Sequence, residues 1–197
     1  MNEITFKEIV SIILFKPTTE IDLLLNQPKF KHVYIFPVLY GIFLGMYLAA
    51  GQVGLSNLQH LISVSIGSIL SKTLFVVLFC FIYSWLVLFI SNSLQGTANF
   101  NMTFGLMSYS MIPMVIGSIL HLVFFLIGYS CAPLIQSDAM LTIMIRFIFL
   151  SQFVFVLWSV FILVIGNAFI NSFSMTRSLI SSAGLIILFA AWIIFRK

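Results

Sequence analysis

The sequence predicts an all-α, polytopic membrane protein with five transmembrane helices and an N-terminal interfacial amphipathic helix. Hydrophobic residues make up 61% of the 197 residues, against about 45–50% in soluble domains. Charged residues make up only 7%, against about 25% in soluble domains. So few charges cannot cover a globule of this size, which excludes a soluble enzyme, a nucleic-acid binder and a disordered chain. Long apolar segments, separated by short polar connections, complete the pattern.

The first 31 residues predict a helical arm at the membrane surface. Apolar side chains recur there at the spacing of an interfacial amphipathic helix, at Phe6, Ile9, Val10 and Ile13. Pro17 ends this helix, and a second short helix precedes Pro28. The apolar run over residues 9–15 is shorter than the roughly 20 residues of a span. We therefore expect residues 1–31 to form an interfacial, cytoplasmic arm and residues 32–197 to form the five-helix transmembrane domain.

The first predicted span, residues 33–50, contains Gly41 and Gly45 four residues apart. Glycines at this spacing let two helices approach closely in lipid, so we expect them to pack against another helix. Three further spans are predicted later in the chain, over residues 104–128, 141–167 and 179–195. The first of these three is interrupted by Pro113.

The second apolar segment, residues 61–90, is too long for one upright span and contains Lys72. We expect the chain to change direction there. The part before Lys72, which carries a stripe of small residues, is expected to lie at the interface, and residues 73–91 are expected to cross the bilayer. Lys72 itself is expected to extend to the interface at the junction. The small residues are Ser63, Gly67 and Ser71.

The distribution of basic residues predicts the orientation. Four lysines precede the first span, namely Lys7, Lys16, Lys29 and Lys31. Basic residues favour the cytoplasmic side, and the first helix usually decides the topology. With five spans, the N-terminus is expected in the cytoplasm and the C-terminus outside. We expect a multi-pass protein of the cell inner membrane or plasma membrane.

Three elements, in order, resemble the Yip-domain family, which is named for its interaction with Ypt/Rab GTPases. They are a Phe-Lys-Pro opening before a short acidic helix, a Tyr-x-x-x-Pro element, and a Trp…Gly pair followed by a basic turn. The residues that carry the resemblance are Pro17, Tyr109, Pro113, Trp158 and Gly166. The opening is similar to that of bacterial members, and the resemblance implies five membrane helices and a cytoplasmic N-terminal part. The acidic Asp-Leu-Tyr-Gly-Pro element of eukaryotic members is absent, so we expect no Rab-type GTPase as a partner.

The sequence does not carry the motifs of an enzyme. It has no HExxH, no GxSxG and no Gly-rich phosphate loop, and its three histidines are isolated. We expect a non-enzymatic protein without a cofactor, a metal or a nucleic-acid partner. A disulfide between Cys80 and Cys131 remains open, because the sequence shows only that they lie far apart.

Polar and small residues share one face in each of two predicted spans. The face of the third span contains Ser110, Gly117 and His121 beside Pro113, and that of the fourth contains Gln152, Ser159, Gly166 and Asn167. Lipid offers these groups no hydrogen bonds, so both faces should point into the bundle and toward each other. One interpretation is helix packing alone. The other is a cavity for a lipid headgroup, an ion or a small solute, with His121 as the titrating group.

These interpretations predict two functions. The first is a membrane-organising or adaptor role through helix packing, with membrane lipids and either other membrane proteins or a second copy as partners. The second is a small transporter or channel-like permease with a polar intramembrane cavity around His121. A continuous water-accessible cavity that reaches His121 would favour the permease, whereas a closed, dry bundle would favour the adaptor.

Overall fold

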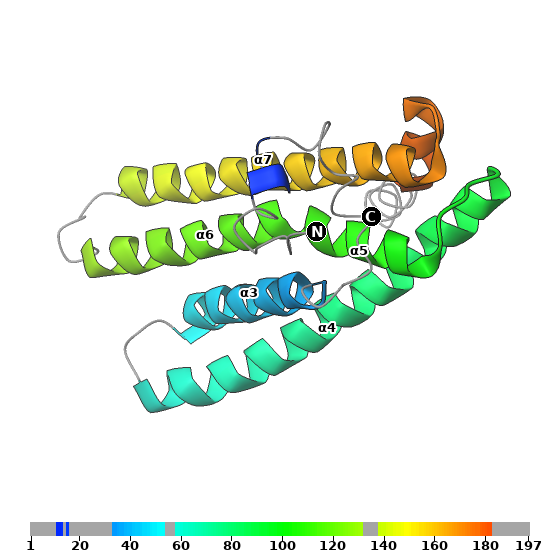
Figure 1. Ribbon diagram of the computed structural model, residues 1–197. Coiled ribbons are helices and arrows are strands. Elements are labelled where there is room, and N and C mark those ends of the chain that lie inside the picture. The colour runs from blue at the N-terminus through cyan, green and yellow to red at the C-terminus, as the bar shows by residue number, and fades with distance from the viewer. Residues whose placement is uncertain (1–10, 14, 16–32, 54–57, 132–137, 183–197) are drawn as a thin grey trace, which may run out of the picture.

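The computed structural model describes residues 11–13, 15, 33–53, 58–131 and 138–182 of the chain, and these residues form helices without a strand. The main helices are α3 (Ile35–Val53), α4 (Leu58–Ser93), α5 (Phe100–Ser110), α6 (Ile112–Cys131) and α7 (Asp138–Asn171) (Figure 1). A further helix begins at residue 175 and is described as far as residue 182. The predicted all-α class is confirmed.

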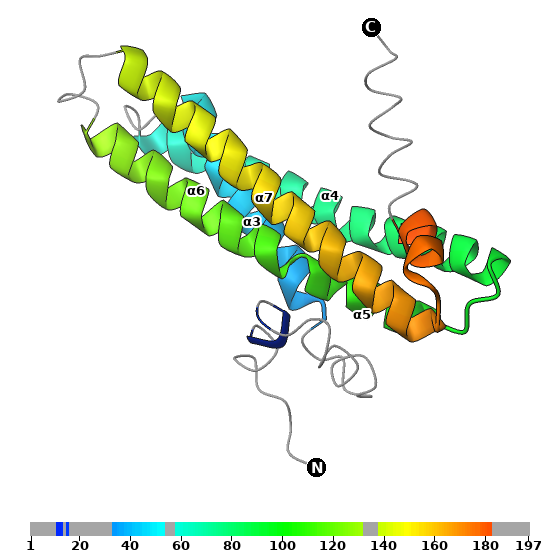
Figure 2. The same ribbon diagram turned by 90° about the horizontal axis from the view of Figure 1, so that it is seen from above.

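The long helices run alternately in opposite directions (Figures 1 and 2). Helix α3 packs against α4 and α6, and α7 packs against α5 and α6. We call the end of the bundle where α3 stops and α4 begins the α3–α4 end. The opposite end, where α4 stops and α5 begins, is the α4–α5 end. Helix α6 stops and α7 begins at the α3–α4 end, so each connection joins neighbouring helices.

Three segments of the described chain are long and apolar enough to cross a membrane: Ser65–Ser93, Phe100–Ile127 and Arg146–Asn171. Ile35–Ala49 is a shorter apolar helix. The outward faces carry large apolar side chains, such as Phe89 and Phe153, which are 67% and 59% exposed. Such faces are expected where lipid is the solvent. The chain is a multi-pass membrane protein. The predicted fifth span, residues 179–195, lies almost wholly outside the described residues, so the count of five remains a prediction.

The predicted break at Lys72 is wrong, because α4 is one helix of 36 residues. Nothing in its first half forces a break: no proline occurs there, and Ser68 donates from Oγ to the Gly45 carbonyl oxygen at 3.0 Å. That bond and the packing on α3 hold the segment in the helix. At 1.5 Å per residue α4 is about 54 Å long, more than the roughly 30 Å of a hydrocarbon core. Accordingly, it runs obliquely to the other helices (Figure 1).

Pro113 lies in the first turn of α6, where its missing N–H costs no helical hydrogen bond. The chain therefore breaks between α5 and α6 near the position that the proline predicts. Helix α5 begins at Phe100, four residues earlier than expected. The reason is Asn99, whose side chain caps the helix by accepting a hydrogen bond from the Met102 N–H at 3.0 Å.

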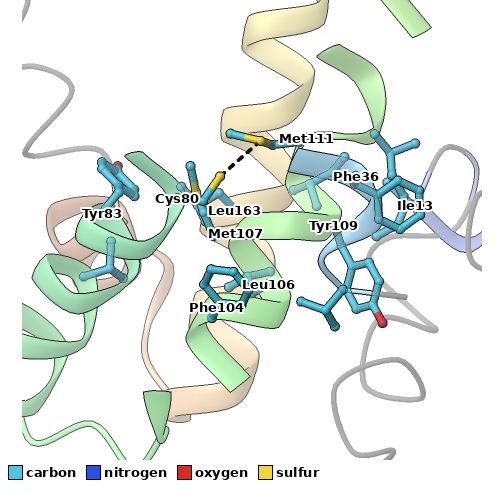
Figure 3. Packing of buried hydrophobic residues seen from close by; sticks show 14 of the residues in the cluster. Ile13, Phe36, Cys80, Tyr83, Phe104, Leu106, Met107, Tyr109, Met111 and Leu163 are labelled. Carbon is cyan, nitrogen blue, oxygen red and sulfur yellow. Dashed lines mark hydrogen bonds between the residues drawn. The ribbon is translucent and has the colours of Figure 1, made fainter. Parts of the chain in front are cut away.

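The buried core lies between α3, α4, α5, α6 and α7 (Figure 3). The Phe36 ring meets the Tyr109 ring edge-on, with centroids 5.9 Å apart. Cys80 Sγ lies 3.3 Å from Met111 Sδ, and its thiol is free, so a Cys80–Cys131 disulfide does not form. Ile13, from the N-terminal region, is fully buried in the same cluster. Ser11, Ile12 and Phe15 are the other described residues of the predicted arm, and the remainder lies outside the described residues.

Candidate functional site

His121 is the most polar side chain inside the third predicted span, and α6 buries it to 2% exposure. Its Nε2 lies 2.8 Å from Ser151 Oγ on α7. Ser151 Oγ also lies 2.9 Å from the Ile148 carbonyl oxygen. With its proton directed to that oxygen, Ser151 accepts from Nε2 of the neutral imidazole. The Gln152 side chain also interacts with His121. The hydrogen bond between His121 and Ser151 thus links α6 to α7.

Aromatic rings enclose His121 on two other sides. The Tyr47 ring of α3 lies 6.0 Å from the imidazole, and the Phe155 ring of α7 lies 6.5 Å from it, between centroids. Gly117 lies one turn earlier on α6. A Cβ at Gly117 would be 2.6 Å from Phe155 Cδ2, so the glycine makes room for this ring. His121 therefore sits at the junction of three helices.

The other residues predicted for these two faces are distributed over α5, α6 and α7 and do not form one site. Ser110 Oγ donates to the Met107 carbonyl oxygen at 2.7 Å, and Gly166 is buried. Ser159 Oγ is buried and has no hydrogen-bond partner among the described residues. Asn167 is 15 residues beyond Gln152 on α7, which is about 22 Å along the helix axis. The structure therefore separates Asn167 from His121.

Asn167 belongs to a second polar group, which we call the asparagine cluster: Ser91, Asn167, Asn171 and Ser181. All four side chains are buried to 3% exposure or less. Asn171 Nδ2 donates to Asn167 Oδ1 at 2.8 Å, and Asn167 Nδ2 donates to Ser181 Oγ at 2.5 Å. Ser91 Oγ lies 3.5 Å from Asn167 Oδ1. The cluster joins the end of α4, the end of α7 and the helix that begins at residue 175.

The loop after α4 closes onto this cluster. The Ala98 N–H donates to Asn171 Oδ1 at 3.1 Å, and a Cβ at Gly96 would lie 2.3 Å from the same oxygen. Sequence reasoning missed Ser91 and Asn171 because they lie at the end of the predicted span 73–91 and beyond the end of the predicted span 141–167. The available signal was the spacing of Asn167 and Asn171, which are one helical turn apart.

Gly41 and Gly45 face α4 at backbone distance. A Cβ at Gly41 would lie 2.4 Å from Thr73 Cα, and one at Gly45 would lie 2.6 Å from Ile69 Cα. Helix α3 therefore approaches α4 more closely than any side chain at these two positions would allow.

The residues of the family-like motif are distributed over the bundle. Tyr109 and Pro113 are buried where α5 meets α6, and Gly166 is buried in α7. Trp158 is 37% exposed on α7. Pro17 lies outside the described residues.

The contacts of Ser151 are of the kind that joins helices. Its Oγ lies within hydrogen-bond distance of both His121 Nε2 and the Ile148 carbonyl oxygen. Among the described residues, no three of His, Cys, Asp and Glu lie close enough to hold a metal ion.

A family model matches nearly the whole chain. No curated protein and no solved structure matches the chain at a significant level. The Yip1 domain model matches residues 11–195. This family consists of non-enzymatic membrane proteins that interact with Rab GTPases and with other membrane proteins. The match, together with the apolar helices, shows that the chain belongs to the Yip1 domain family.

Proposed function

We propose that this protein is a non-enzymatic membrane-organising or adaptor protein, which acts through the lipid-facing surfaces of its helices. One observation carries the proposal: most buried polar side chains of the described bundle are hydrogen-bonded to other side chains or to backbone carbonyls, whereas many of its large apolar side chains face outward. His121 is bonded to Ser151, and Asn167 is bonded to Asn171 and Ser181. Groups engaged in this way contribute to helix packing, which leaves the outer faces to meet partners.

The outer faces can be tested by photo-crosslinking in the native membrane. A photoreactive phenylalanine analogue replaces Phe89 on α4 or Phe153 on α7, which are 67% and 59% exposed. Phe104, which is 5% exposed in α5, is the matched control. We expect discrete adducts with another membrane protein or a second copy from at least one exposed position and none from Phe104. Adducts with lipid alone from both exposed positions would contradict the adaptor role.

A permease is the second candidate function. It is favoured by the placement of a titratable ring, His121, within the predicted third span. In vesicles that contain a pH-sensitive dye, a permease coupled to this ring would carry protons, and His121→Leu would abolish the flux. Under the adaptor role, the internal pH of vesicles that contain the protein equilibrates no faster than that of vesicles without it.

The family resemblance supports finer assignments as part of the same proposal. The similarity of the opening, through Pro17, to bacterial members supports a bacterial-type member in the inner or plasma membrane. We propose a cytoplasmic N-terminus, an outside C-terminus and no Rab-type partner. Co-purification of the chain with a Rab-type GTPase would contradict the last of these.

A further inference from the structure

Lys72 places a positive charge inside a membrane span. The segment Ser65–Ser93 of α4 is continuous and apolar, so Lys72 cannot leave the bilayer through a break in the helix. It lies 21 residues before Ser93, the last residue of α4, which is about 32 Å along the helix axis and close to the thickness of one hydrocarbon core. A charge at this edge of the core is stabilised when it reaches an anionic partner.

The described part of the chain does not supply that partner. Apart from Asp138, which begins α7 and not a helix packed against α4, the charged residues of the described helices are Lys72, Arg146 and Arg177, and all three are cations. Lys72 is half-buried. Side chains on a helix lean toward its N-terminus, which directs the Lys72 ammonium toward the α3–α4 end. The nearest abundant negative charge there is the phosphate layer of the bilayer.

The surface beside Lys72 is open and polar. Gly67 is exposed, and a Cβ placed on it would meet no atom within 4 Å. Ser71 is exposed, and Ser68 is partly exposed. Successive positions at about 100° per residue place Gly67, Ser68, Ser71 and Lys72 on one arc of α4, beside the side that contacts α3. Small side chains on this arc leave room for a headgroup to sink toward the ammonium.

Deeper in the bilayer the same arc becomes aromatic. Phe75 and Phe79 are 64% and 43% exposed, and their rings stack with centroids 6.3 Å apart. A polar patch near the span's end, followed inward by an exposed apolar surface, matches the head and the acyl chain of a lipid.

We infer that the Lys72 ammonium binds the phosphate of an anionic lipid on the open surface left by Gly67, Ser68 and Ser71. The hydroxyls of the two serines donate to backbone carbonyls. The acyl chain of this lipid lies over Phe75 and Phe79. This site adds one specific lipid contact to the proposed function. It rests on that function only because it requires the outer faces of the helices to contact lipid. Because its test counts bound lipid and the crosslinking test counts protein partners, each proposal can fail alone.

The test measures lipid enrichment around the full chain. The protein is reconstituted in nanodiscs of equal parts phosphatidylcholine and phosphatidylglycerol, and the lipids that remain after mild detergent extraction are quantified by mass spectrometry. We expect phosphatidylglycerol to be enriched, and Lys72→Gln to lower the enrichment about fivefold. Lys72→Arg keeps the charge and should keep the enrichment.

A matched control removes a different cation. Arg177 is an exposed residue of the helix that begins at residue 175, and this helix follows the end of α7 at the α4–α5 end (Figure 2). Arg177→Gln should leave the enrichment unchanged. Gly67→Leu keeps the charge but fills the open surface, and it should lower the enrichment as Lys72→Gln does. Equal losses from Lys72→Gln and Arg177→Gln, or no loss from Lys72→Gln, would overturn the site. Displacement of the lipid by added inorganic phosphate would assign the site to free phosphate and would also overturn the proposal.

Discussion

The hydrogen bond between His121 and Ser151 shows what residue spacing could and could not predict. Helical spacing placed His121 on an inward face, because an imidazole in lipid requires a partner. It singled out Gln152, whose side chain does interact with His121, but it missed Ser151, whose Oγ lies 2.8 Å from His121 Nε2. Adjacent residues on one helix differ by about 100° in direction, so spacing identifies a face but not every partner.

A double-mutant cycle measures this bond. His121→Leu, Ser151→Ala and the double variant are compared by reversible unfolding in detergent micelles. We expect a coupling free energy of about 0.5–2 kcal/mol, in the range of interhelical hydrogen bonds in membrane proteins. A coupling energy near zero would show that the two side chains do not stabilise the contact between α6 and α7.

The ends of the helices could be predicted only to within a few residues, because hydropathy falls before the helix stops. Helices α4 and α7 both end in turns with a left-handed residue, Gln95 with φ 68° and Ser172 with φ 52°. In each turn a backbone N–H reaches back five residues, from Gly96 to Ser91 O at 2.8 Å and from Phe173 to Ala168 O at 2.8 Å. These are the bonds of a Schellman cap. Without a glycine at the left-handed position, the sequence does not signal such a cap.

Glycine at these left-handed positions should therefore stabilise the protein. A side chain in the left-handed conformation costs roughly 1–2 kcal/mol, and glycine avoids this cost. Part of the resulting gain in stability is offset by the greater conformational freedom of glycine in the unfolded chain. We expect Gln95→Gly and Ser172→Gly each to raise the free energy of unfolding by about 0.5–1 kcal/mol. Thermal unfolding of each variant in detergent measures the effect, and a loss of stability would mean that these turns do not persist in the protein.

The sequence predicted that α3 packs closely against another helix, but it did not predict that this helix is α4. The spacing of Gly41 and Gly45 predicted a close helix contact, and the structure places Thr73 and Ile69 opposite them. The interpretation of Lys72 as a break point hid this partner, because it assigned residues 63–71 to an interfacial segment. Hydrophobic periodicity could not correct the error, since apolar residues lie on all sides of α4 and mark no single inward face.

Alanine substitutions test the α3–α4 contact. Gly41→Ala and Gly45→Ala would each place a Cβ within 2.4–2.6 Å of a backbone carbon of α4, so the helices must separate. We expect each to lower the free energy of unfolding by about 1–3 kcal/mol. The matched control is Gly67→Ala, which meets no atom within 4 Å and should stabilise the helix by about 0.5–1 kcal/mol. If all three variants change the free energy of unfolding by the same amount, helix propensity and not the α3–α4 contact accounts for the effect of the glycines.

At the scale of the whole molecule, composition alone predicted the fold class, because a chain with so few charges must be solvated by lipid. Only the Asn167–Asn171 spacing pointed to the asparagine cluster, and its other members were not predictable, since they come from positions as far apart as Ser91 and Ser181. Such pairings depend on which helix ends meet, and a single sequence does not encode them as a local pattern.

The orientation of the molecule gives a further prediction. Lys7, Lys16, Lys29 and Lys31 precede the first span, so we expect the N-terminus in the cytoplasm. With five spans, a C-terminal reporter that is active only in the cytoplasm should be silent. The same reporter at the N-terminus is the control and should be active. Strong C-terminal activity would mean an even number of spans or reversed insertion.

The central claim is that the bundle around His121 is closed and that its polar groups serve packing. The most direct measurement is the reaction of Ser151→Cys with a small charged thiol reagent in open membrane sheets, after Cys80→Ala and Cys131→Ser remove the native thiols. Thr176→Cys, at an exposed position, is the control that should react readily. We predict that the cysteine at position 151 reacts at least about tenfold more slowly, because no water reaches it. Reaction of both cysteines at similar rates would reveal a water-filled cavity at His121 and would contradict the account.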